Sequence, residues 1–114
     1  MTTPFFQPVS GIDLPRFAGV PTFMRLPHLT PNDPAYADVQ MGLVGIPWDS
    51  GTTNRPGARH GPRMLRDLST MIRAGNPVTG INPFTTVNCA DLGDISPNPV
   101  DIMDCMERIT TFYT

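Results

Sequence analysis

The 114-residue sequence contains no lysine, only two cysteines and only two histidines. Without lysine, the chain can form neither the phosphate-binding lysine of a P-loop nor a Schiff base. Its cationic side chains are eight arginines, and ten acidic residues bring the formal net charge to −2. Proteins that bind nucleic acids carry a basic excess instead. We therefore expect no nucleic-acid partner.

The cysteines and histidines are too scattered to suggest a metal site. Cys89 and Cys105 form no CxxC or zinc-binding spacing, and His28 and His60 are isolated, so the chain offers no set of transition-metal ligands. Two free thiols are typical of a reducing compartment. The sequence also has no apolar run of about 18 residues and no secretory signal pattern. We expect a cytoplasmic protein with no membrane partner.

Proline is abundant, and seven of the fourteen prolines fall within residues 1–40. Because proline is excluded from helix interiors and lacks the N–H that a sheet requires, this segment is predicted to be an irregular arm. Its apolar residues are too many for a solvated tail. We predict that they anchor the arm against the body or a neighbouring subunit, the alternative being a partly ordered leader. They are Phe5, Phe6, Ile12, Leu14, Phe17, Val20, Phe23, Met24, Leu26 and Leu29.

A strand and a helix are predicted directly after the arm. The apolar run from Met41 to Pro47 is typical of a parallel strand buried on both faces. A helix is then expected after a Gly61 cap, with Pro62 at its first position and Gly75 as its left-handed terminator. Its apolar residues recur at helical spacing. They are Met64, Leu65, Leu68, Met71 and Ile72.

A second strand and helix follow. Residues 85–90, leading into 91–94, favour a strand, and a helix is expected after an Asn98 cap, with Pro99 at its first position. Its predicted apolar stripe consists of Ile102, Met106, Ile109 and Tyr113. The order β-α-β-α predicts an α/β fold with a parallel sheet.

Two such strands and two helices cannot cover each other, and the last helix is expected to continue to Thr114 without a stop signal. We therefore interpret residues 41–114 as the first βαβα units of an incomplete larger domain, preceded by the arm of residues 1–40. A piece that needs a partner is the alternative.

The loop after the first strand carries the candidate binding residues. Ligands of open parallel sheets bind at the carboxyl ends of the strands. Here glycines and prolines shape a loop whose polar side chains are Asn54, Arg55, Arg59 and His60. The arginines could grip a ligand carboxylate, or form ion pairs with Asp49, Asp91 or a neighbouring subunit. His60 could be a general base or a hydrogen-bonded spacer.

A second candidate site lies at the end of the second strand. Asp91 and Asp94 could bind a hard metal or act as a base. A spacing of three residues across a glycine is equally natural for hydrogen bonds within a turn. The sequence leaves both readings open.

Long stretches of the chain resemble a known superfamily. The motif Gly-Leu-Val-Gly-Ile-Pro-Trp-Asp-Ser-Gly occupies residues 42–51, and Thr-Asn-Arg-Pro-Gly-Ala-Arg-His-Gly-Pro-Arg occupies 53–63. With residues 15–27 upstream and 90–94 downstream, the chain resembles the N-terminal region of the ureohydrolase superfamily of arginases and agmatinases. It is most similar to the guanidinopropionase and guanidinobutyrase branch, with agmatinase close behind.

The resemblance implies an arginase-like three-layer α/β/α fold, a dinuclear manganese centre and hydrolysis of a guanidino substrate to urea and an amine. It also implies a homo-oligomer, a trimer or a hexamer. Residues 54–60 would lie at the rim where the far end of the substrate is bound, and an arginine there suits the carboxylate of a guanidino acid.

The metal-binding runs of the superfamily, Gly-Gly-Asp-His, Asp-Ala-His-x-Asp and Asp-x-Asp, do not occur in this sequence. We therefore assign no catalytic residue and no metal ligand, and expect a fragment of a manganese ureohydrolase that is inactive alone. A short interaction module without catalysis is the alternative. A nucleotide or anion binder using the glycine-rich loop is disfavoured, because that loop lacks the phosphate-binding spacings.

Overall fold

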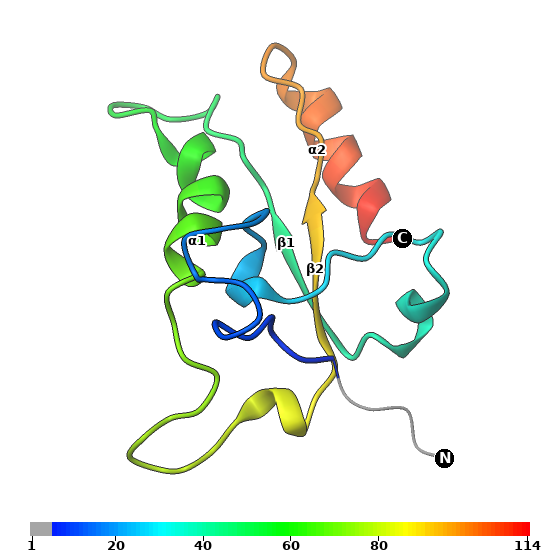
Figure 1. The fold of residues 1–114 in the computed structure, drawn as a ribbon. Helices are drawn as coiled ribbons and strands as arrows, with labels where there is room; N and C mark the ends of the chain where they lie inside the picture. The colour runs from blue at the N-terminus through cyan, green and yellow to red at the C-terminus, as the bar shows by residue number, and fades with distance from the viewer. Residues whose placement is uncertain (1–5) are drawn as a thin grey trace.

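The computed structural model describes residues 6–114, which form a small α/β unit (Figure 1). Two parallel strands, β1 (Met41–Gly45) and β2 (Cys89–Asp94), lie side by side. Helix α1 (Gly61–Ser69) follows β1 and helix α2 (Ile102–Phe112) follows β2. Figure 1 shows α1 to the left of the strands and α2 to their right. The predicted parallel β-α-β-α order is therefore confirmed.

The strands are shorter and more exposed than predicted. In β1, Met41 is 54% exposed and Gly42 is also exposed, so the expected burial on both faces does not hold within residues 6–114. β2 begins at Cys89 because residues Pro83–Thr85 form a 3-10 helix, whose start the Asn82 side chain caps by accepting from the Phe84 N–H. The first three residues of β2, Cys89 to Asp91, are buried, and a neighbouring segment covers the other edge of the strand.

That neighbour is the arm. The Asp91 N–H donates to the Pro27 carbonyl at 2.9 Å and the Leu29 N–H donates to the Asp91 carbonyl at 3.0 Å, so His28 pairs in parallel with Asp91. Pro27 takes part through its carbonyl oxygen, because proline lacks the backbone N–H but can still accept a hydrogen bond. A proline-rich arm can thus lie along a strand when its proline accepts a hydrogen bond and a neighbouring residue donates the other.

The apolar residues of the arm divide into two groups. Leu26 is 2% exposed and packs with Phe84 and Cys89 in the hydrophobic core, which confirms it as an anchor to the body. Ile12 and Phe17, by contrast, are more than nine-tenths exposed and anchor nothing within the described residues. Phe5 lies outside them. Whether the exposed group contacts a neighbouring subunit stays a prediction.

Helix α1 ends earlier than predicted and turns a different face to the strands. It ends at Ser69, where the Ser69 and Thr70 hydroxyls donate back to helix carbonyls, and Gly75 has no left-handed conformation. Its partly buried residues are Gly61, Pro62, Arg66 and Ser69. The apolar stripe expected to be buried is exposed instead: Met64 57%, Leu65 60% and Leu68 59%.

Helix α2 also starts later than predicted. Its N-cap is Asp101, whose carboxylate accepts from the Asp104 N–H at 3.1 Å, while the Asn98 side chain accepts from backbone N–H groups in the preceding turn. Pro99 consequently lies outside the helix. The helix ends at Phe112 with Tyr113 as its C-cap, so the expectation that it continues to Thr114 is wrong.

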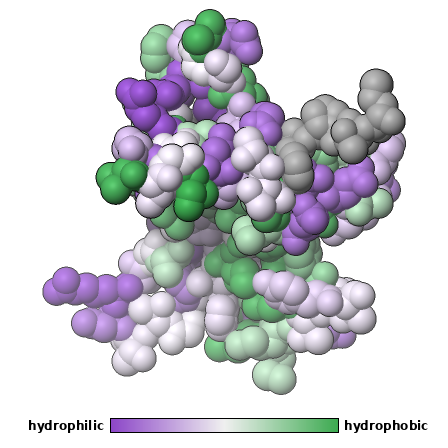
Figure 2. Space-filling view, turned by 90° about the horizontal axis from the view of Figure 1, so that it is seen from below, coloured by the Kyte–Doolittle hydropathy of each residue, from purple (hydrophilic) through white to green (hydrophobic). Residues whose placement is uncertain are grey.

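The buried face of α2 differs from the predicted stripe. Cys105 is fully buried, whereas Ile102, Met106 and Tyr113 are 45–67% exposed and only Ile109 of the stripe is half-buried. Figure 2, which views the lower end of the molecule, shows hydrophobic residues at the surface near the centre of the view. Cys89 and Cys105 are both free, as predicted, and the structure shows that both are buried. No helix within residues 6–114 has the length and apolar character needed to cross a membrane.

Candidate functional site

The loops that follow β1 and β2 meet at the carboxyl ends of the strands. β1 leads into residues 46–60 and β2 into residues 95–101, and both loops lie at the upper end of the view in Figure 1. The Ser50 hydroxyl donates to the Pro99 carbonyl at 3.0 Å, which ties the two loops together. The structure thus places the candidate loop where ligands of parallel sheets bind.

Asp49 organises the first loop from inside. Its carboxylate is buried and accepts from Arg59 Nε at 2.7 Å, from the Gly57 N–H at 2.7 Å and from the Arg59 N–H at 3.2 Å. Gly57 has a φ of 145°, a conformation that favours glycine. Burial opposes ionisation of Asp49, but the hydrogen bonds from Arg59 and the Gly57 N–H outweigh it and hold the pKa below its usual value. The Arg59 guanidinium therefore holds the loop in shape.

Arg59 and His60 line a small cavity, whereas Asn54 and Arg55 lie outside it. The cavity has a volume of about 230 Å³ and is lined by Pro47, Arg59, His60, Arg63 and Asp94. Asn54 and Arg55 are exposed in the loop between Asp49 and Gly57. The structure thus brings two of the four predicted binding residues to one cavity and leaves two in solvent beside it.

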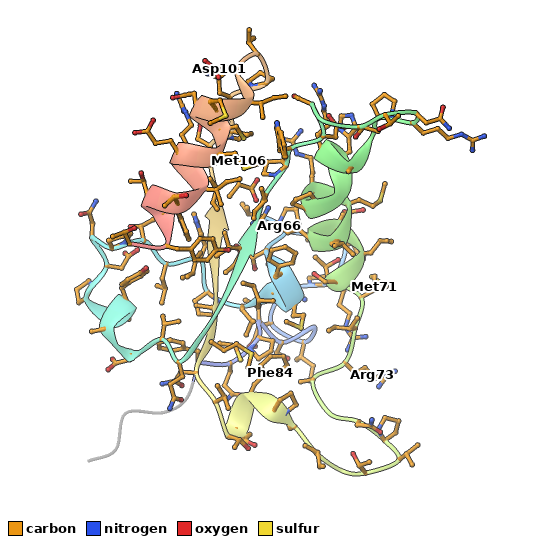
Figure 3. The ribbon with its side chains drawn as sticks, turned by 180° about the vertical axis from the view of Figure 1, so that it is seen from behind. Arg66, Met71, Arg73, Phe84, Asp101 and Met106 are labelled. Atoms are coloured by element: carbon orange, nitrogen blue, oxygen red, sulfur yellow. The ribbon has the colours of Figure 1, made fainter. Side chains whose placement is uncertain are left out.

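Arg66 is the central charged residue that the sequence did not single out. From α1 it reaches Asp91 through Nε at 2.8 Å and Nη2 at 3.1 Å, and Asp94 through Nη1 at 2.7 Å. Its guanidinium lies 4.3 Å from the centre of the Phe23 ring. Figure 3 shows Arg66 between α1 and the strands. One guanidinium therefore joins α1, β2 and the arm.

A signal for Arg66 was present in the sequence. Pro62, Arg66 and Ser69 recur at helical spacing, as do the apolar residues of the same helix. The hydrophobic pattern predicted that the apolar face of α1 packs on the strands. The face that does so is the one carrying Arg66, which pairs with the carboxylates of Asp91 and Asp94 in β2. Only the position of Asp91 opposite α1 reveals which face packs inwards.

Asp91 has its hydrogen-bonding capacity filled. Besides Arg66, its carboxylate accepts from the Phe23 N–H at 2.9 Å and from the Gly93 N–H at 2.8 Å. Burial favours the neutral acid, but the hydrogen bonds from Arg66 and the two backbone N–H groups outweigh burial and hold the pKa of Asp91 below its usual value. A carboxylate so occupied is poorly placed to act as a base, and the turn hydrogen bond to Gly93 is the alternative that the sequence left open.

The described residues do not fit a manganese pair. Within residues 6–114, no three His, Cys, Asp or Glu side chains are grouped so that they could hold a metal ion. Asp91 and Asp94, which the sequence offered as metal ligands, both bind Arg66. A cation would have to displace that guanidinium, so we assign no metal ligand here.

The lowered pKa values of Asp49 and Asp91 predict acid sensitivity. Both carboxyls titrate lower in the folded chain than the reference value of 3.8. Their contribution to stability is therefore fully present above the unfolded pKa and is lost as the pH falls through the folded pKa. We expect the free energy of unfolding, measured in urea between pH 7 and pH 2.5, to hold down to about pH 5 and to fall below it. Constant or rising stability on acidification would contradict the expectation.

Comparison with known proteins places this geometry in a family. The Arginase family model matches residues 39–114. Guanidinopropionase of Pseudomonas aeruginosa is 53% identical over 107 residues, covering 94% of this chain and 32% of the relative. Guanidinobutyrase of the same organism is 43% identical, covering 94% of this chain and 33% of the relative.

A solved structure gives the same result. Proclavaminate amidino hydrolase from Streptomyces clavuligerus superposes with a TM-score of 0.76 at 39% identity, over 86% of this chain and 31% of that one. The chain therefore matches one part of the arginase-like fold and spans about a third of the length of the relatives it matches.

Proposed function

This chain belongs to the arginase family, and we propose that it forms the arm and the first βαβα units of a three-layer α/β/α guanidino hydrolase. The reaction we propose is hydrolysis of a guanidino compound to urea and an amine, with a guanidino acid as the first candidate substrate. The observation that carries the proposal is the 53% identity to guanidinopropionase over 107 residues. Residues 1–40 are the arm in this reading and residues 41–114 the βαβα units.

The role of this chain in such an enzyme is to bind substrate. The manganese pair that we propose for the enzyme would supply an activated hydroxide when bound. Because residues 6–114 do not fit that pair, we propose that its ligands lie outside the described residues. What the chain can offer is the loop at the carboxyl end of β1.

Within that loop, the arginines have different tasks. Arg59 is held by Asp49 at 2.7 Å and maintains the loop, with His60 and Arg63 on the adjacent cavity. Arg55 is exposed and forms no ion pair among the described residues, so its guanidinium is free to bind a carboxylate in bidentate fashion. Asn54 beside it offers a neutral hydrogen-bonding group. We propose that Arg55 and Asn54 contact the far end of the substrate.

The exposed apolar residues of both helices support a larger assembly. Leu65 and Leu68 of α1 and Met106 of α2 are 45–60% exposed, and neighbouring apolar residues extend both surfaces. Exposed apolar surface of this extent marks a region that another polypeptide segment covers. We propose that further layers of the fold and the contacts of a homo-oligomer cover these helices.

The test is a chimera in which residues of this chain replace the matching third of P. aeruginosa guanidinopropionase. We expect the chimera to release urea from guanidinopropionate, and Arg55→Ala to raise KM for that substrate roughly tenfold to a hundredfold, since a hydrogen bond to a charged group contributes about 1.5–3 kcal/mol. For agmatine, whose far end is cationic, KM should stay within about twofold, because no salt bridge to Arg55 is lost.

Arg73→Ala in the same chimera is the matched control, since Arg73 is exposed in the loop after α1 and lies at the other end of the helix (Figure 3). It should leave both KM values unchanged. Equal increases for the two substrates in Arg55→Ala would assign Arg55 a structural role. A folded, metal-loaded chimera that releases no urea would contradict the proposed function.

A further inference from the structure

A second cavity lies at the opposite end of the molecule from the candidate loop. It has a volume of about 270 Å³ and is enclosed by residues 7–11 and Arg16 of the arm, the turn at Met24 and Arg25, and residues 72 and 74 after α1. Two of its lining residues are arginines and none is acidic. A concave site lined by two arginines and no acidic residue is positively charged.

Arg25 is the unusual residue of this cavity. It is only 7% exposed, and both terminal nitrogens of its guanidinium are buried without a hydrogen-bond partner within residues 6–114. Burying a charged group costs several kcal/mol unless it is paired. Arginine is also always protonated in proteins, so it cannot escape the cost by becoming neutral. A guanidinium in this position needs an anionic partner.

The backbone holds Arg25 in place against its conformational preference. Met24 and Arg25 have φ values of 52° and 58°, a left-handed conformation that non-glycine residues rarely adopt. The turn is fixed by the Phe23 N–H donating to Asp91 at 2.9 Å and the Met24 N–H donating to Ser69 at 2.8 Å. The Arg25 carbonyl also accepts from the Val9 N–H at 3.1 Å. Strain that the surroundings maintain in this way is characteristic of functional sites.

Arg16 supplies the second positive charge. It is half-buried, forms no ion pair among the described residues, and lies over Gly11, where a Cβ atom would be 3.6 Å from its Nε. The arm thus folds back so that Arg16 faces the same cavity as Arg25. Arg16 and Arg25 both line this cavity, and paired arginines are suited to planar or tetrahedral oxyanions.

We infer that Arg25 and Arg16 form a binding site for an oxyanion, a carboxylate or phosphate group. The inference does not rest on the proposed hydrolase function, because neither arginine has a part in that proposal. They also lie away from the carboxyl ends of the strands. The group can come from a free small anion or from an acidic side chain of another polypeptide segment, and the chemistry is the same for both.

The test is the thermal unfolding of the 114-residue chain in phosphate or succinate, compared with chloride at equal ionic strength. We expect Tm to rise by about 5 °C at an anion concentration about ten times Kd. Arg25→Gln should abolish the rise and Arg16→Gln should reduce it. Because Arg25→Gln removes an unpaired buried charge, its Tm without anion should equal or exceed that of the parent chain.

Arg73→Gln is the control, since it changes the net charge equally but lies outside the cavity lining, and it should keep the full response. Arg25→Lys retains the charge without the two-pronged guanidinium and should weaken anion binding at least tenfold, which provides a second variant if Arg25→Gln fails to fold. No anion-specific rise in the parent chain, or the same rise in both Arg25 variants as in the parent, would overturn the inference.

The chimera distinguishes the two sources of the oxyanion. If a free anion fills the site, phosphate or succinate raises the Tm of the chimera as it raises the Tm of the 114-residue chain. If an acidic side chain fills it, the chimera does not respond to added anion but is destabilised by Arg25→Gln. A chimera whose Tm neither rises with added anion nor falls with Arg25→Gln would contradict the presence of this oxyanion site in the assembled protein.

Discussion

Replacing Asp91 with Asn is expected to lower the free energy of unfolding by about 3–5 kcal/mol, since it removes one partner of a buried ion pair. The Asp91 side chain is 2% exposed and that of Arg66 is 13% exposed. The substitution preserves size but leaves Asp94, which is itself 39% exposed, as the only carboxylate bound to Arg66. Urea unfolding at pH 7 measures the loss. Small domains are stable by about 5–15 kcal/mol, so this is a large fraction of the total.

Asp67→Asn is the matched control for this prediction. Asp67 neighbours Arg66 on α1, but its carboxylate is exposed and has no partner among the hydrogen bonds of the described residues. The same chemical change there should alter stability by less than about 0.5 kcal/mol. If Asp91→Asn cost no more than Asp67→Asn, the Arg66 pair would not hold α1 and the arm to β2.

Replacing Leu26 with Ala is expected to cost about 2–5 kcal/mol, the range for truncating a large buried aliphatic side chain. Leu26 packs with Phe84 and Cys89, and it belongs to the same part of the arm as Pro27, which hydrogen-bonds to β2. The truncation should loosen the arm as well as the core. Urea unfolding gives the energy, and amide hydrogen exchange at Leu29 and Asp91 reports on the arm.

Ile12→Ala is the counterpart on the exposed part of the arm. Ile12 is 95% exposed, so its truncation should change the stability of this chain by less than about 0.5 kcal/mol. Equal losses for Leu26 and Ile12 would mean that the whole arm is packed in solution. The pair of variants therefore separates the anchoring residues of the arm from those left exposed.

Periodicity predicted the order of the elements better than their bounds. The apolar run at 41–45 and the segment ending at Asp94 form the parallel strands, and the helices follow each of them. The bounds moved because short polar side chains competed with glycine and proline signals. Ser69 and Thr70 end α1 before Gly75, and Asp101 begins α2 after Pro99.

The candidate loop was predictable in position and partly in role. Residues 54–60 follow β1, so parallel pairing alone places them at the carboxyl end of the sheet. For Arg59, the structure shows the ion pair with Asp49 that the sequence offered as the alternative to ligand binding. Charge and spacing in the sequence cannot distinguish an ion pair within the protein from ligand binding, since a guanidinium group is suited to either role.

The sequence by itself determined the α/β class, the absence of lysine chemistry and the resemblance to the ureohydrolases. These conclusions depend on composition and on the order of residues along the chain, which the sequence gives directly. The tertiary structure alone decided which side of α1 faces the strands and which arginines have partners. Arg66 finds Asp91 and Asp94 across 25 and 28 residues, while Arg25 is buried with none among the described residues. Pairing between distant charges depends on their separation in space, and only the folded chain sets that distance.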